Sequence, residues 1–292
     1  MAGPRDEMSR NLHSGNGHAG PGTSGPQGCE IKLLPDRLHE DAAAFATRVN
    51  PVNAPLRIPM AAGLSIEPQA LTMVTSKYWG PAQRRLTVSF TESPSEDLRA
   101  RIISHLNAWA KSTSVSFFET DKAGDVRISL GQGGYYSYLG TDIKLVPPNR
   151  QTMNLEGFHM GMPESEFRRV VRHEAGHTLG FAHEHMRKEL VSRIDREKAY
   201  AYFLRTQGWD PDTVNQQVLT PLDDADIMGT PADQDSIMCY QLPGEITSDG
   251  LPIRGGVDIN KSDFTFAGKV YPKAQAVLEH EWPPSEDVLL PT

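Results

Sequence analysis

A short run in the middle of the sequence holds residues that could bind a metal ion and act on water: His173, Glu174, His177 and His183. On a helix, His173 and His177 lie four residues apart on one face, so both imidazoles can reach one ion, while Glu174 faces the same cleft. Catalytic zinc usually has three protein ligands and one position for water, and Gly180 lets the chain turn back so that His183 becomes the third. We therefore predict one catalytic Zn²⁺ ion, with Glu174 as the general base.

Three neutral imidazoles would leave the positive charge of the ion largely uncompensated. This favours loss of a proton from bound water, whose pKa at catalytic zinc falls to ~7. An ordinary solvated helix is the alternative interpretation of the His173–His177 pattern, because short motifs also arise by chance. The glycine and the third histidine at fixed spacing, at the end of a capped amphipathic helix, argue against that alternative.

The helix that carries these residues should begin near Pro163–Glu166, with Gly180 just beyond its end. Its buried face should consist of Phe167, Val170, Val171 and Leu179. Before it we predict the alternating strand Arg85–Phe90, then a helix with Ser93 as its N-cap and proline at the first helical position. The remaining predicted elements are strands at 115–118 and 126–130 and helices at 195–206, 210–218 and 261–270. The order strand, helix, strand, strand indicates an α/β layer.

Composition divides the chain into segments. Residues 1–28 are crowded with Gly, Ser, Pro and Asn and have no hydrophobic period, which is typical of a disordered tail. From 29 to 76 we expect a leader or possible propeptide, with a short helix at Asp36–Phe45, that packs on a catalytic domain at 77–275. Residues 276–292 should be a solvated tail.

The net charge of -8 argues against a nucleic-acid partner, because such binding depends on Lys and Arg that neutralise phosphates. No segment reaches the length and apolarity of a membrane span, and the start carries no secretory signal. The two cysteines, Cys29 and Cys239, cannot make a disulfide framework, although one bridge between them is possible. We expect a cytoplasmic or non-classically exported protein, while secretion stays open. The sequence is silent on oligomeric state.

The run His173–His183, continued by Glu184–Arg187, resembles the astacin signature within the metzincins, in which glutamate follows the third histidine. Ser236–Tyr240 is similar to the Met-turn of astacins. Three further stretches resemble segments around the zinc motif of that family: Arg193–Arg196, Tyr136–Gly140 and Gln151–Leu155. The resemblance covers about residues 77–272 and is to a bacterial-type member.

This resemblance implies an α/β (α+β) zincin fold. A mixed twisted sheet with the active-site helix, at 77–182, would lie above an irregular lower subdomain at 183–275. It also implies a zinc-dependent endopeptidase whose partners are protein or peptide substrates. The alternatives are a zinc hydrolase of specialised peptide or cell-wall substrates, and a zinc-binding protein without turnover. Glu174 argues against the last, because holding the metal does not require it.

The resemblance also assigns roles to single residues. Met238 would form a hydrophobic floor under the zinc, although an ordinary core methionine fits this residue alone. Tyr240 would be a possible fifth ligand that donates its phenol to the developing oxyanion, with a buried structural tyrosine as the alternative. Glu184, whose counterpart in matured astacins pairs with a newly cut amino terminus, would here hold a buried polar network, because an unpaired carboxylate is costly. Astacins usually have histidine at the position of Cys239, and we expect this thiol to be buried.

Cys29 lies in the predicted leader, which suggests a latency switch. A leader thiolate could occupy the open zinc position and keep the enzyme latent until the leader is removed. The aspartate-bearing leader motif of many astacins is not evident before Pro59, and the disulfide cysteines of secreted astacins are missing. A lone, incidental cysteine is the competing interpretation of Cys29.

Overall fold

The computed structural model describes residues 28–54, 76–222 and 231–274. The tails predicted at 1–28 and 276–292 lie outside these residues, apart from Gly28. The strands are β1 Cys29–Lys32, β2 Arg84–Phe90, β3 Val115–Glu119, β4 Val126–Ser129, β5 Tyr135–Tyr138 and β6 Met153–Leu155. The α-helices are α1 His39–Val49, α3 Glu96–Leu106, α4 Glu164–Glu166, α5 Arg172–Thr178, α6 Lys188–Val191, α7 Arg196–Gln207, α8 Pro211–Val214 and α9 Lys261–Val270. The π-helical segments are η6 Phe167–Val171 and η8 Asn215–Leu219, and the 3₁₀ segments are η2 Asp36–Leu38, η3 Pro51–Asn53, η4 Asn107–Lys111, η5 Gly140–Lys144, η7 Glu184–Met186 and η10 Gly244–Ile246.

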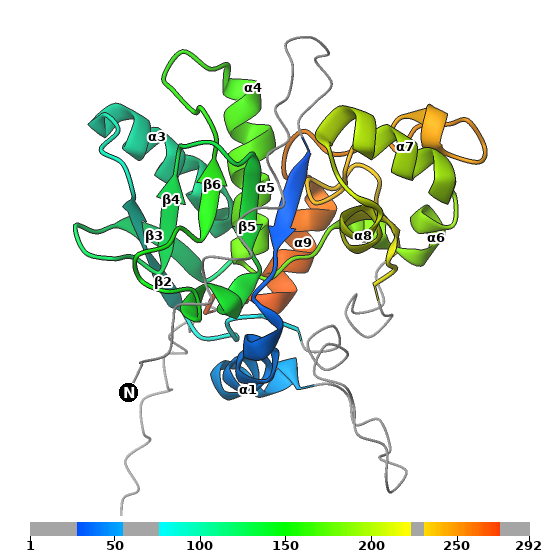
Figure 1. Cartoon of the computed structure of the whole chain (residues 1–292). Coiled ribbons are helices and arrows are strands. Elements are labelled where there is room, and N and C mark those ends of the chain that lie inside the picture. The colour runs from blue at the N-terminus through cyan, green and yellow to red at the C-terminus, as the bar shows by residue number, and fades with distance from the viewer. Residues whose placement is uncertain (1–27, 55–75, 223–230, 275–292) are drawn as a thin grey trace, which may run out of the picture.

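The strands form one mixed sheet in the order β1-β5-β6-β4-β2-β3 (Figure 1). Strand β5 runs antiparallel to β6, and the other neighbouring pairs are parallel. In β2 and β4 alternate residues are fully or almost fully buried, among them Leu86, Val88, Val126 and Ile128, because successive side chains of a strand point to opposite faces. The mixed sheet with its helices confirms the predicted α/β fold class.

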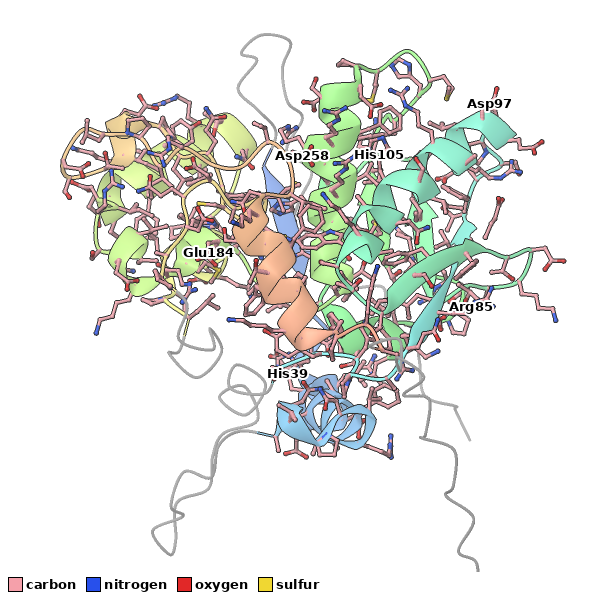
Figure 2. All side chains as sticks on the ribbon, turned by 180° about the vertical axis from the view of Figure 1, so that it is seen from behind. His39, Arg85, Asp97, His105, Glu184 and Asp258 are labelled. Atoms are coloured by element: carbon pink, nitrogen blue, oxygen red, sulfur yellow. The ribbon has the colours of Figure 1, made fainter. Side chains whose placement is uncertain are left out.

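Helices α3 and α5 cover one face of the sheet, as the front and rear views agree (Figures 1 and 2). Helix α3 buries Leu98, Ile102 and Leu106 along one stripe. The prediction of Ser93 as its N-cap is wrong by two residues. Ser95 caps the helix, because its backbone is extended and its hydroxyl accepts a hydrogen bond from the Leu98 amide at 3.4 Å.

The segment predicted as a leader contacts the rest of the chain through a strand and a helix, among other places. Strand β1 pairs in parallel with β5, with Cys29 opposite Tyr135, and so forms the edge of the sheet. The predicted short leader helix is observed as η2 followed by α1, which buries Ala42, Ala43 and Ala46. Figure 1 shows α1 below the sheet and β1 rising along it. Residues 29–54 of the predicted leader therefore pack into the folded body.

The chain after the site helix forms a second half with short helices and long irregular connections (Figure 1). Helices α7 and α9 lie within one or two residues of their predicted positions, and the helix predicted at 210–218 is observed as α8 followed by the π-helical η8. One hydrophobic core runs through both halves, from Ile102 and Ile128 to Phe203 and Ile253. Among the described helices, none is long and apolar enough to cross a bilayer.

Candidate metal centre

The site helix is a continuous run of α4, η6 and α5. Phe167, Val170 and Val171 are fully buried, as predicted, because they recur on the face that meets the sheet and α3. The π-helical segment η6 comes directly before the turn that carries His173. Such bulges are frequent at functional sites, because one extra residue re-aims the side chains that follow.

The chain leaves the site helix through a glycine turn. Gly180 has φ +95°, a conformation that L side chains rarely adopt, and a Cβ there would meet the Tyr78 ring at 3.0 Å. The Trp79 indole donates to the carbonyl oxygen of Thr178 at 2.8 Å, which satisfies one of the free carbonyls at the helix end. This turn brings His183 back to the helix, as the sequence predicted.

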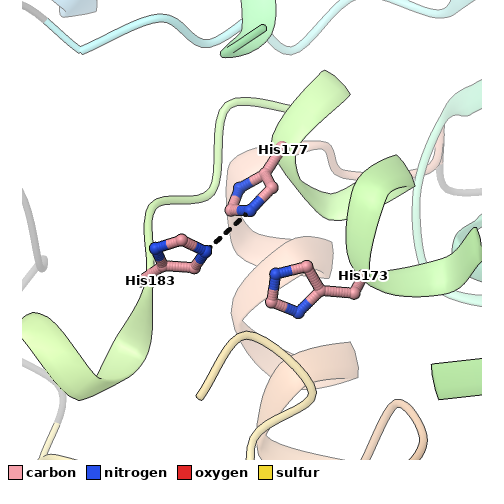
Figure 3. A group of neighbouring side chains, drawn as sticks. All are labelled: His173, His177 and His183. Carbon is pink, nitrogen blue, oxygen red and sulfur yellow. Dashed lines mark hydrogen bonds between the residues drawn. The ribbon is translucent and has the colours of Figure 1, made fainter. Parts of the chain in front are cut away.

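The structure brings the three histidines together (Figure 3). Their ring nitrogens lie within 4.8 Å of one another, and Nε2 of His177 is 3.0 Å from Nε2 of His183. Nδ1 of His173 lies 2.6 Å from the Ile237 carbonyl oxygen, and Nδ1 of His177 lies 2.8 Å from that of Phe181. A carbonyl only accepts, so both Nδ1 atoms carry the proton and both Nε2 lone pairs face the shared space.

This arrangement fits a zinc ion. Two nitrogens on one tetrahedral zinc, each about 2.0–2.1 Å from it, lie roughly 3.3 Å apart, close to the His177–His183 spacing. Nε2 of His173 is buried and has no hydrogen-bond partner among the described residues. Burial lowers the pKa of His173 to about 4 and holds those of His177 and His183 well below the usual value. All three imidazoles are therefore neutral at physiological pH, which is the form that binds metal.

Glu174 lies next to the histidines, with 0% of its surface exposed. Neither carboxylate oxygen accepts a hydrogen bond from an N–H or O–H group of the described residues, and the Cys29 thiol lies beside them. Burial raises the pKa of Glu174 to about 8. A nearby dication would favour the ionised form of this carboxyl, because opposite charge offsets desolvation. A buried acid beside three metal-ligating nitrogens is the donor set of a hydrolytic metal site.

A family model described as Astacin, a peptidase family, matches residues 72–248, which is more than half of the chain. The chain belongs to the astacin family. It is accordingly a zinc-dependent metallopeptidase. No curated protein sequence matches it significantly.

Solved structures resemble this astacin-family chain. A structure of myroilysin is 27% identical, with a TM-score of 0.63, and the match covers 68% of this chain and 97% of that one. A crystal structure of myroilysin, 24% identical with a TM-score of 0.53, matches over 84% and 99% of the two chains. High choriolytic enzyme 1, a hatching enzyme zinc-protease from Oryzias latipes (medaka fish), is 22% identical over 63% and 87%, with a TM-score of 0.43.

In this astacin-family site, Tyr240 lies in a cluster of rings, stacked on His185 and tilted against His183. Its ring lies 4.2 Å from that of His183 and 4.5 Å from that of His185, measured between centroids. The phenol oxygen is buried without a hydrogen-bond partner in the described residues, and burial raises its pKa. His185, which the sequence did not single out, accepts a bond from the Tyr240 amide at 3.4 Å. No sequence signal separates His185 from an ordinary buried histidine.

Met238 lies against the site helix. A Cβ at Gly176 would collide with the Met238 sulfur and would meet Trp109 at 3.3 Å, so this position has no room for a side chain. The Met238 turn is fixed from α9 by Asp263, which accepts from the Ser236 hydroxyl at 2.6 Å and the Ile237 amide at 2.9 Å. Sequence reasoning missed Gly176 and Asp263, although glycine inside a helix is unfavourable and could have signalled a close contact.

Glu184 follows the third histidine and lies beside α9, as Figure 2 shows from behind. It accepts hydrogen bonds from Arg187 Nε at 3.0 Å and from the Asp233 amide at 3.1 Å. The carboxylate is therefore part of a polar network within the fold, the arrangement that we expected for it. Cys239, three per cent exposed, lies under the same region, and burial raises its pKa.

Strand β1 brings Cys29 to the site. Cys29 is buried, and its sulfur lies within 4.8 Å of ligating atoms of both His173 and Glu174. Neither cysteine forms a disulfide, so the possible Cys29–Cys239 bridge is absent. A cavity of about 830 Å³ lies beside the histidines rather than over them, lined by Gly180 and Met238 among others.

Proposed function

We propose that this astacin-family metallopeptidase is an endopeptidase that hydrolyses peptide bonds within proteins. The observation that carries the proposal is the fully buried carboxylate of Glu174, which has no N–H or O–H donor among the described residues, beside three converging histidines. A protein that only holds zinc has no need of that carboxylate, and leaving it unpaired would be costly. The proposal includes a leader at 29–76 and a catalytic domain at 77–275, with upper and lower subdomains that meet at residue 183.

In the proposed mechanism, His173, His177 and His183 would hold the zinc, and its chemistry there would be to polarise the scissile carbonyl and to acidify water. Glu174 accepts the proton of the attacking water and passes it to the leaving amine. The Tyr240 hydroxyl, which has no partner within the described residues, donates to the oxygen on which negative charge develops. His185 holds the Tyr240 ring in its stack.

The substrate should lie extended along β5. That strand has one neighbour within the catalytic half, β6, and its other edge now pairs with leader strand β1. When β1 leaves, the N–H and C=O groups of Tyr135 and Ser137, which face β1, become available to another extended chain, as in β-augmentation. The same edge therefore serves leader and substrate in turn.

The leader would keep the enzyme latent through Cys29. Its sulfur lies close to the atoms that bind the ion and to the catalytic base, and the strand that carries it blocks the β5 edge. His177, His183 and Glu174 have no exposed surface while the leader is in place. A thiolate is a strong zinc ligand and would exclude the water that the reaction needs.

Peptide hydrolysis by three variants tests the proposal, with zinc content measured on each. Glu174→Gln should retain zinc and lose about 100-fold or more in kcat, since a general base contributes roughly 10²–10⁴-fold. Tyr240→Phe should lose about 100-fold while binding substrate normally. Glu189→Gln, an exposed carboxylate on α6, is the matched control and should keep full activity. The assays use the full chain, with and without Cys29→Ala. Equal activity of wild type and Glu174→Gln would refute the mechanism.

A further inference from the structure

The side-chain amide of Gln217 binds the main chain of the leader strand at one residue. The Ile31 amide donates to Gln217 Oε1 at 3.0 Å, and Gln217 Nε2 donates to the Ile31 carbonyl oxygen at 3.0 Å. Gln217 is two per cent exposed, and both of these bonds are buried. A primary amide offers the same donor and acceptor pair as a neighbouring strand. Both hydrogen bonds are therefore made to the main chain of Ile31, and neither depends on its side chain.

The leader strand is thus held on both edges. On one edge β1 pairs with β5, and on the other the N–H and C=O of Ile31 face Gln217. Successive residues of a strand direct these groups to opposite sides, so Glu30 and Lys32, which flank Ile31, face β5. An extended chain in this cleft is therefore paired with β5 on one edge and with the side-chain amide of Gln217 on the other.

Gln217 is fixed by the wall of the active site. It lies on η8 between the buried residues Val214 and Val218. The main-chain carbonyl oxygen of Gln217 lies 3.0 Å from Nε2 of His185, and Tyr240 stacks on the ring of His185. The amide is therefore held at a set position relative to the residues proposed to act on substrate, and it is pre-organised before any peptide arrives.

We propose that Gln217 is a substrate-binding residue that forms the same two hydrogen bonds with the main chain of an extended peptide substrate. The inference rests on the proposed endopeptidase function. When the leader leaves, the Gln217 amide loses both of its leader partners, and its donor and acceptor are free to bond another main chain. A peptide lying along β5 restores both bonds at one residue that faces away from that strand. Proline is excluded at this substrate position, because it has no N–H to donate.

Backbone N-methylation of a peptide tests this directly. We would measure the Kd of a fluorescent eight-residue peptide, and of its singly N-methylated forms, by anisotropy on the zinc-loaded full chain. The chain carries Cys29→Ala, so that the leader releases the cleft, and Glu174→Gln, so that the peptide binds without being cleaved. Methylation should weaken binding at the positions whose N–H groups face β5. It should also weaken binding about tenfold at one position between them, the residue whose N–H donates to Gln217. In the added Gln217→Leu variant that intervening loss should disappear, while the losses at the β5-facing positions remain. The leader competes equally with every peptide form, so its effect cancels.

Two more variants complete the test. Gln216→Leu changes the exposed neighbour on η8 and should leave the methylation profile unchanged. Gln217→Glu keeps the acceptor, so it should keep the intervening loss, and it serves if Gln217→Leu fails to fold. An unchanged profile in Gln217→Leu overturns the inference, as does a peptide that binds none of the proteins. Cleavage of the same peptide by the chain that retains Glu174 tests the endopeptidase function separately, whatever the methylation profile shows.

Discussion

The sulfur of Cys29 lies beside the carboxylate of Glu174, although Cys29 belongs to the leader and Glu174 to the site helix. Their ligating atoms, with one from His173, fall within 4.8 Å of one another. Burial and the neighbouring Glu174 raise the pKa of the Cys29 thiol, so the thiol is neutral unless a cation is present. The leader thus brings a potential zinc ligand to the place where the reaction would occur.

We expect the Cys29→Ala variant of the full chain to be more active than wild type, by about tenfold or more. The alanine cannot ligate zinc, so the leader should release the cleft more often. Peptide hydrolysis and the on-rate of a zinc-binding hydroxamate inhibitor would be measured. Cys239→Ala is the control, because that thiol is also buried but lies outside the metal-ligating clusters. If Cys29→Ala changes neither activity nor inhibitor access, the latency proposal fails.

Removal of zinc should destabilise the chain as well as inactivate it. At free zinc about 100-fold above its Kd, binding adds about 2.7 kcal/mol to the folded state, which is about 5–10 °C in Tm for a chain of this size. Chelator should lower Tm accordingly, and zinc should restore it where calcium does not, because imidazole suits zinc. Metal analysis of the untreated protein should give about one zinc per chain. A Tm that does not respond to chelator would contradict the three-histidine site.

Gly256→Ala should destabilise the chain by about 1–3 kcal/mol, because a Cβ there would collide with the main chain of Ser236 and Ile237. Main-chain atoms in the Met238 turn cannot rotate away as a side-chain end can. Urea unfolding would measure the loss. Val257→Ala, at the exposed neighbouring position, should change stability by less than about 0.5 kcal/mol. Equal stability of the two variants would show that the turn can shift freely.

Asp263→Ala should cost about 2–4 kcal/mol and reduce activity. The change leaves the buried Ile237 amide and the Ser236 hydroxyl without their acceptor, and it removes the capping box of α9. Stability and kcat would be measured together, because the Met238 turn lies against the site helix. Lys261→Ala on the same helix is the control and should be nearly neutral. A variant that loses stability but keeps full kcat would mean that the turn holds its position without this anchor.

The sequence by itself predicted the fold class and the three histidines that converge in the structure. His173 and His177 follow from helical spacing, and Gly180 supplies the positive φ that returns the chain to His183. These features are local, because helix geometry and one glycine decide them over a few residues. Ser95, the cap found in place of Ser93, shows the limit even there, since two serines two residues apart offer the same hydroxyl.

The tertiary structure decided what surrounds that local set. The meeting of Cys29 with Glu174 depends on the parallel pairing of β1 with β5, which no spacing in the sequence encodes. Gln217 reaches Ile31 across 186 residues, and Asp263 reaches the Met238 turn from another helix. Such contacts depend on how distant elements pack, so buried polar residues acquire their partners only when the chain has closed on itself. The residues His173–His183 therefore indicate the chemistry of the site, whereas tertiary packing decides which distant residues surround that site.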